Sequence, residues 1–179
     1  KLERQKKIPL ISYSRYLRTS RAMISKEFNG GTLADIVAYC IMPTHFHLLL
    51  KQNTENGITD YLSKVENSYS KYANTIYKRK GPLWEARFRS VHVDTDEQLL
   101  HLTRYIHLNP SSIGLVNNPK NWEYSSYNEY LSVGNNSICS FHDLFTISKK
   151  EYQKFVNNRI AYQKELSIIK TQLIDDYSG

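Results

Sequence analysis

The fold of this 179-residue chain is decided by residues 36–51, which read IVAYCIMPTHFHLLLK. The run from 36 to 42 is apolar and rich in β-formers, which is typical of a buried strand. Pro43 and Thr44 then favour a turn, and a second apolar stretch follows at 45–51. We therefore predict two antiparallel strands within residues 32–42 and 45–51.

Two histidines stand at alternate positions of the second predicted strand. Because successive side chains of a strand point to opposite faces, His45 and His47 are expected to project together, while Phe46, Leu48 and Leu50 are expected to point into the core. Two imidazoles on one face can chelate a metal ion, although an exposed sheet face also accommodates two histidines without one. A metal site needs further groups from another element.

The segments that follow predict two helices, a strand and a helical tail. Residues 58–76 repeat apolar side chains at alternating intervals of four and three, which indicates a long amphipathic helix that ends before Gly81. Residues 85–93 are expected to form a strand. A capping box, Asp94 with Glu97, predicts a helix that Pro110 ends at Asn109. A polar, helix-prone tail covers residues 148–174.

The charge and aromatic content favour a nucleic-acid partner. The chain has 24 Lys and Arg against 17 Asp and Glu, a net charge of +7, together with 14 Tyr, 6 Phe and 2 Trp. Cations attract phosphate, and aromatic rings stack on unpaired bases, so single strands suit this mixture. Trp84 is a candidate stacking platform, or else a core residue. The candidate phosphate contacts, which a solvated basic face would equally explain, are Lys78, Arg79, Lys80, Arg87 and Arg89.

The composition also bounds the class and compartment of the protein. With 40% hydrophobic residues the chain can bury a core, so it is expected to be globular. No apolar run is long enough for a membrane span, and no secretory signal is evident, so we expect no membrane partner. Only Cys40 and Cys139 are present, which fits a reducing cytoplasm.

The helix predicted over residues 94–109 carries His101, Tyr105 and Asn109 at intervals of four, and residues so spaced share one helix face. A phenol and an amide directed toward two histidines are the groups needed to cleave a phosphodiester by covalent catalysis. The alternative is that Tyr105 is one of many tyrosines with a ring to bury.

Four ordered blocks carry a family resemblance. They are PTHFHLL at 43–49, GPLWEARFRS at 81–90, RYIHLNP at 104–110 and WEYSSY at 122–127. Over about residues 32–131 the chain resembles the single-tyrosine HUH transposases, and most of all the REP-associated tyrosine transposases.

The resemblance implies a metal-dependent enzyme that nicks and joins DNA. His45 and His47 would bind a divalent ion, Mg²⁺ or Mn²⁺, with Asn109 as third ligand. Tyr105 would attack single-stranded or hairpin DNA and form a 5′-phosphotyrosine intermediate, and a homodimer is possible in this family. Since Pro110 disfavours helical geometry at Asn109, His107 or His101 are alternative third ligands.

The fold implied is α+β, a ferredoxin-like antiparallel sheet with helices on one face. Its first strand is expected upstream of Lys1 or from another chain, because Ile8–Tyr13, the strand-like candidate before Thr32, contains Pro9. A helix over residues 13–28 is also expected. The predicted organisation is a basic lead-in at 1–31, a nuclease domain at 32–133 and a helical extension at 134–179.

Two rival functions remain at this point. The first is a catalytically silent relative that binds hairpin DNA without cutting it. The second is a metal hydrolase that uses water, which is disfavoured because no acidic cluster accompanies the histidines. A covalent adduct between Tyr105 and DNA would separate both from a live nuclease.

Overall fold

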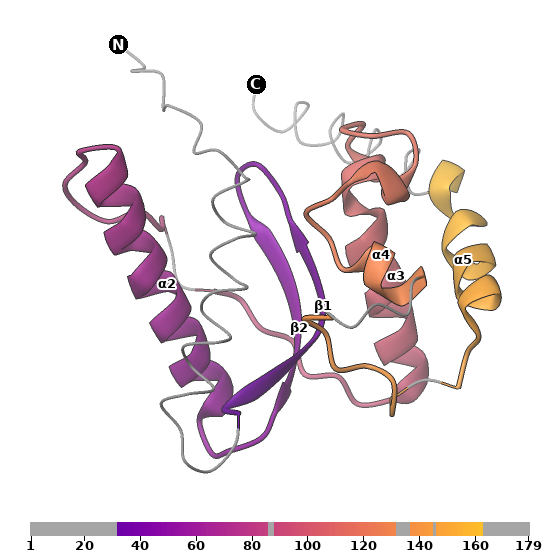
Figure 1. Ribbon diagram of the computed structural model, residues 1–179. Coiled ribbons are helices and arrows are strands. Elements are labelled where there is room, and N and C mark those ends of the chain that lie inside the picture. The colour runs from indigo at the N-terminus through magenta and orange to yellow at the C-terminus, as the bar shows by residue number, and fades with distance from the viewer. Residues whose placement is uncertain (1–31, 86–87, 132–136, 145, 163–179) are drawn as a thin grey trace, which may run out of the picture. The chain divides into compact units, whose positions relative to one another are not determined.

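The computed structural model describes residues 32–85, 88–131, 137–144 and 146–162 (Figure 1). Its elements are β1 (Ala34–Ile41), β2 (Phe46–Gln52), α2 (Gly57–Ile76), α3 (Asp96–Ser112), the 3-10 helix η1 (Pro119–Asn121), α4 (Tyr127–Leu131) and α5 (Lys149–Asn157). This combination confirms the predicted α+β class. Two compact units divide the chain: the first contains α2, the second contains α3, α4 and α5, and the hairpin contributes residues to both.

β1 and β2 pair as the predicted antiparallel hairpin. Met42 N donates a hydrogen bond of 2.8 Å to His45 O, which closes the turn between the strands. β1 is buried along nearly its whole length, as its apolar sequence predicts, whereas β2 is fully buried only at Leu49. The partly accessible side chains of β2 include His47, so this strand can present a functional group to a ligand.

The edge of β1 that faces away from β2 is covered by residues 122–130. Ser126 N donates to Tyr39 O at 2.9 Å, and Tyr130 Oη donates to Val37 O at 2.8 Å. Unpaired edge groups are costly when buried, so this segment satisfies polar groups that a further strand would otherwise pair. The same segment thereby joins the hairpin to the helices of the second unit.

α2 confirms the predicted amphipathic helix, and its buried side chains include Leu62, Val65 and Tyr69. The buried apolar face of α2 ends earlier than predicted, because Ile76, the last residue of the helix, is 53% exposed. Gly57 begins the helix so close to the carbonyl of Leu33 that a side chain at this position would collide with the backbone.

The strand predicted over residues 85–93 is wrong for the residues that the structure describes there, 85 and 88–93, which form no strand. Phe88 and Val91 are three positions apart, so they cannot share one face of a strand. Val91 is 82% exposed, and the segment therefore lacks the buried face that would fix a strand register.

Both predicted ends of α3 need correction. The N-cap is Thr95 and not Asp94: Thr95 Oγ1 accepts from Gln98 N at 3.1 Å, and Gln98 Oε1 accepts from Asp94 N at 2.9 Å. The helix also continues through Pro110 to Ser112. Pro110 is fully buried, so packing in this last turn outweighs the hydrogen bond that its ring removes.

Several predictions concern residues outside the described ranges. These are the basic lead-in 1–31, the candidate strand Ile8–Tyr13, the helix over 13–28, and Arg87. Of the tail predicted over 148–174, α5 and the residues up to 162 are described. Within the described ranges, no helix has the length and apolar character needed to cross a membrane.

We expect Ser126→Ala to lower the free energy of unfolding by about 1–3 kcal/mol, because the buried Tyr39 amide and the ring of His107 would each lose a partner. Urea unfolding followed by circular dichroism measures the loss. Ser140→Ala is the matched control, since the Ser140 side chain is exposed, and it should change stability by less than about 0.5 kcal/mol. Equal losses in the two variants would contradict this role of Ser126.

Candidate active site

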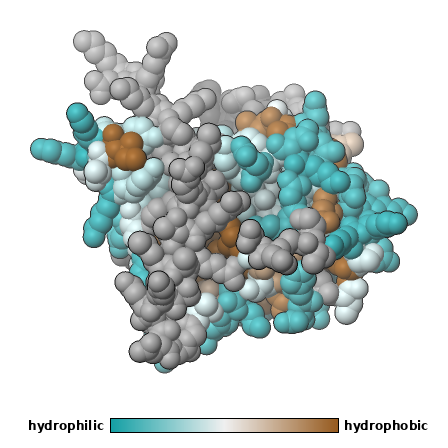
Figure 2. All heavy atoms as spheres, in the orientation of Figure 1, coloured by the Kyte–Doolittle hydropathy of each residue, from teal (hydrophilic) through white to brown (hydrophobic). Residues whose placement is uncertain are grey.

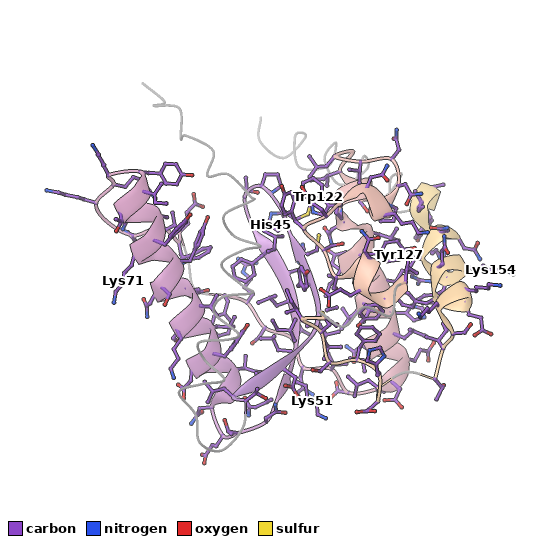
Figure 3. All side chains as sticks on the ribbon, viewed as in Figure 1. His45, Lys51, Lys71, Trp122, Tyr127 and Lys154 are labelled. Atoms are coloured by element: carbon purple, nitrogen blue, oxygen red, sulfur yellow. The ribbon has the colours of Figure 1, made fainter. Side chains whose placement is uncertain are left out.

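The hairpin brings the two histidines together, and Figure 3 shows His45 at its turn end. The rings of His45 and His47 lie edge to face with centroids 5.0 Å apart. His45 is exposed, and its Nδ1 lies 3.1 Å from Thr44 Oγ1. Trp122 lies at the same end of the hairpin and donates from Nε1 to Ile41 O at 3.0 Å. The imidazole pair is therefore accessible yet held on a hydrogen-bonded support.

The tyrosine of α3 faces this pair. The ring centroid of Tyr105 lies 5.7 Å from that of His47, at an interplanar angle of 77°. One turn further along α3, Asn109 Nδ2 donates to Tyr105 O at 3.1 Å. Tyr105 is 41% exposed, so its hydroxyl can meet a ligand from solvent. The structure thus brings together all four residues that the sequence predicted as catalytic or metal-binding.

The electrostatics of His47 favour a neutral imidazole. Burial lowers its pKa, the charge of His45 lowers it further, and the side chain of Asn109 opposes them by favouring the protonated ring. Because Asn109 Nδ2 donates to Tyr105 O, the amide oxygen of Asn109 is the atom left to face the ring. Even so, His47 Nε2 is buried without a hydrogen-bond partner of ordinary geometry among the described residues. A neutral ring with an unpartnered nitrogen is the form that binds a metal ion.

The groups around His47 fit a divalent cation. His45 and His47 offer imidazole nitrogens, and Asn109 offers an amide oxygen once its nitrogen is engaged with Tyr105. Among the described residues, no group of three or more His, Cys, Asp or Glu is placed to hold a metal, so an amide would have to complete the set. Mixed nitrogen and oxygen donors suit Mn²⁺, and they leave positions for the waters that Mg²⁺ retains.

A buried chain of hydrogen bonds fixes the other face of α3. It runs from Tyr39 N to Ser126 Oγ (2.9 Å), to His107 Nε2 (2.7 Å), from His107 Nδ1 to Tyr152 Oη (2.7 Å), and on to Thr103 Oγ1 (2.9 Å). The chain therefore connects β1, the start of α4, α3 and α5. It holds α3 while Tyr105, two residues before His107, faces the imidazole pair.

Donor counting assigns His107 as a neutral ring with its proton on Nδ1. Thr103 Oγ1 already donates to a carbonyl of α3, so it accepts from Tyr152 Oη. Tyr152 Oη then accepts from His107 Nδ1. The Ser126 hydroxyl has one proton and two acceptors within reach, Tyr39 O at 3.2 Å and His107 Nε2 at 2.7 Å, and the shorter contact makes His107 Nε2 its acceptor. Burial lowers the pKa of His107 to about 3, which agrees with a neutral ring.

The two histidines expected as substitutes for Asn109 have other contacts. Both ring nitrogens of His107 are occupied inside the core. His101 packs edge to face on Phe155, with centroids 5.5 Å apart, and its Nδ1 accepts from Arg104 at 3.0 Å. Of the three candidates, Asn109 is the one whose side chain acts on His47.

The residues predicted to bind nucleic acid belong largely to the first compact unit. Lys78, Arg79 and Lys80 are exposed just after α2, and Arg89 is exposed in the segment without regular structure. Trp84 is half-buried: its Nε1 donates to a carbonyl of α2 at 3.2 Å, and its ring lies against a tyrosine of the same helix at 5.9 Å. Its packing role is therefore established, whereas DNA stacking stays a prediction.

Sequence reasoning missed the partners of two α3 residues that flank Tyr105 in the sequence, His107 and Arg104. Tyr152 bonds to His107 across a separation of 45 residues, so no local pattern could reveal the pair. Arg104 lies beside Tyr105 and carries its guanidinium 4.0 Å from the ring centre of Phe155 in α5. Its position next to the tyrosine was visible in the sequence, but its aromatic partner was not.

Comparison with known proteins points to one family. The family model described as Transposase IS200 like matches residues 12–109. A REP-associated tyrosine transposase of Haemophilus influenzae is 31% identical over 105 residues, covering 52% of this chain and 58% of the relative, so the match spans little more than half of either. A solved REP-associated tyrosine transposase bound to a REP hairpin has 17% identity and a TM-score of 0.59, over 83% of this chain and 84% of that one. At this identity, the structural likeness establishes the fold.

We expect the burial of neutral His107 to make the protein less stable in acid. As the pH falls below 6.5, the unfolded chain protonates this histidine while the folded chain does not until about 3, so unfolding is favoured. Between about pH 7 and pH 5 this contributes a loss of about 2 kcal/mol. Urea unfolding at both pH values measures it.

The variants His107→Gln and His142→Gln provide the comparison for this acid effect. His107→Gln should lose the pH-dependent contribution, while His142→Gln, altered at an exposed histidine, should retain it. If the wild-type protein and His107→Gln lose the same stability on acidification, His107 is not the group responsible.

Proposed function

This chain belongs to the IS200-like transposase family, and we propose from that premise that it cleaves and rejoins single-stranded DNA through Tyr105. The observation that carries the proposal is the meeting of the Tyr105 ring with the His45–His47 pair, 5.7 Å from His47. A phenol beside a pair of imidazoles with an unpartnered nitrogen is the arrangement that covalent cleavage of a phosphodiester needs.

In the proposed reaction the Tyr105 oxygen attacks phosphorus and the bond from phosphorus to the 3′ oxygen breaks. The phenol loses a proton and the departing 3′ oxygen gains one, which leaves a free 3′-hydroxyl and a 5′-phosphotyrosine. Rejoining is the reverse transesterification, so no nucleotide triphosphate is consumed. α3 directs the phenol toward the imidazole pair, and the 41% exposure of Tyr105 leaves room for a DNA strand.

His45, His47 and Asn109 would hold Mg²⁺ or Mn²⁺. The bound ion would supply Lewis-acid polarisation of the scissile phosphate. The neutral state of His47, which burial favours, supports this assignment because a protonated imidazole cannot bind a cation.

Hairpin DNA is the proposed partner. A structural relative was solved with a REP hairpin, and the charge of +7 suits a polyanion. Lys78, Arg79, Lys80, Arg87 and Arg89 are the proposed phosphate contacts, and Trp84 the proposed stacking surface. The Tyr105–His47 contact lies within one chain, which supports cleavage by a monomer, and the homodimer stays a prediction. Both cysteines are free thiols, which supports a cytoplasmic location.

The rival function is a catalytically silent relative that binds hairpins without cutting them. It requires the same basic surface but no productive tyrosine. Accessibility of Tyr105 beside the imidazole pair favours the nuclease, since a purely binding protein has no need to keep a phenol at a chelating pair.

We expect the full chain to form a metal-dependent covalent adduct with labelled oligonucleotides that contain a hairpin and single-stranded flanks. Tyr105→Phe should abolish the adduct, because its ring cannot form the phosphoester. Tyr77→Phe removes a tyrosine hydroxyl from the first unit and should leave adduct formation unchanged. Denaturing gel electrophoresis detects the species. A silent binder would form no adduct, and a water-using hydrolase would still cut with Tyr105→Phe.

We expect Mn²⁺ to bind the full chain without DNA, and His47→Ala or Asn109→Ala to weaken binding by more than about tenfold, since each removes a ligand. Loss of the free-ion signal in electron paramagnetic resonance measures the affinity without reference to activity. Asn128→Ala, which changes an exposed asparagine, is the control. Equal affinity in wild type and His47→Ala would rule out the proposed ligand set.

A further inference from the structure

Arg104 occupies an unusual position immediately before the proposed nucleophile. Its guanidinium lies 4.0 Å from the ring centre of Phe155 in α5, and its Nη2 donates to His101 Nδ1 at 3.0 Å. Because a guanidinium is always a donor, His101 must accept and cannot neutralise the charge. Among the described residues, the positive charge of Arg104 is thus held in place by a ring and an imidazole and not by a carboxylate.

A second arginine belongs to the C-terminal segment that Arg104 contacts. Arg159 follows Phe155 by four residues, and its guanidinium lies 5.1 Å from the ring centre of Tyr162. The guanidinium of Arg104 lies on Phe155, four residues before Arg159, so both cations meet the same stretch of the C-terminal segment. In agreement, burial and then the charge of Arg159 lower the pKa of Arg104, while Tyr152 opposes them. Among the described residues, neither guanidinium has an acidic partner. With no acidic partner in the described part of the chain, two guanidinium groups on one segment repel each other, and an anion bound between them would offset that repulsion.

The surroundings select a phosphate of a single-stranded nucleic acid. Planar guanidinium groups match phosphate oxygens, and aromatic rings beside them offer stacking surfaces for unpaired bases. Tyr162 is 49% exposed, so one such ring is accessible. Figure 2 shows a largely hydrophilic surface over α5, which suits a charged strand better than an apolar protein partner.

We propose that Arg104 and Arg159 form a second phosphate-binding site, built jointly by α3 and α5, for the DNA strand that Tyr105 attacks. The inference rests on the proposed function and extends it, because Arg104 and Tyr105 are successive residues of one helix. A strand held at the arginine pair is tethered within a few nucleotides of the phenol. The helix after residue 148 then takes part in binding the substrate.

The test measures salt dependence of binding to a fluorescent oligothymidylate strand, with the full chain carrying Tyr105→Phe so that no cleavage occurs. Each phosphate contact with a single strand contributes about 0.7 to the slope of log affinity against log salt. Adding Arg159→Gln should reduce the slope by about 0.7, and adding both Arg104→Gln and Arg159→Gln by about 1.4. Arg159 is exposed, so its variant tests the site even if Arg104→Gln disturbs packing.

Lys154→Gln is the matched control, since it removes one charge from α5 at a side chain that points away from α3 (Figure 3). Equal slopes for Arg159→Gln and Lys154→Gln would overturn the arginine site. If the wild-type chain still formed its adduct, the proposed function would stand. If Arg159→Gln reduced the slope of log affinity against log salt but the wild-type chain formed no adduct, the arginine site would stand and the proposed cleavage would be wrong. No binding of the strand at all would overturn both.

Discussion

The hydrogen bond between Ser126 Oγ and His107 Nε2, 2.7 Å long and fully buried, is the constraint on which the candidate site depends. Ser126 is itself bonded to the backbone of β1 at Tyr39, so His107 ties α3 to the strand that precedes the histidine turn. A buried imidazole left without partners would be costly, so this connection strongly specifies one placement of α3. The imidazole of His107 must also stay neutral, because no acidic side chain among the described residues is bonded to it to offset a charge.

The consequences follow from the geometry of one helix. At 3.6 residues per turn, His107 and Tyr105 point to nearly opposite sides of α3, whereas Tyr105 and Asn109 share a side. Fixing His107 in the core therefore directs Tyr105 and Asn109 together toward His47. Continuation of α3 through Pro110 serves the same end, because a helix that ended at Asn109 would leave its amide on a fraying terminus.

Local periodicity predicted most residues of the candidate site, but few of the long-range contacts that hold those residues in place. The period of two placed His45 and His47 on one face, and the spacing of four placed Tyr105 with Asn109; both relations are properties of single elements. The strand over 85–93 failed because its apolar positions do not alternate, and a strand needs partners that a local window cannot supply. His107 with Tyr152 was invisible for the same reason, since 45 residues separate them and only tertiary packing joins them.

Binding a metal ion requires a histidine side chain to be neutral, whereas attracting phosphate requires it to be positively charged, so one residue cannot do both at once. A metal ligand must be neutral, and burial keeps His47 in that state, but a neutral imidazole attracts no phosphate. Permanent cations can attract the substrate only if they stay clear of the metal, whose charge would repel them. In this chain the guanidiniums of Arg104 and Arg159 lie against Phe155 and Tyr162 of the C-terminal segment, while the imidazoles belong to the hairpin. Under the proposed function, attraction of the polyanion and ligation of the cation would therefore fall to different elements, with α3 connecting them.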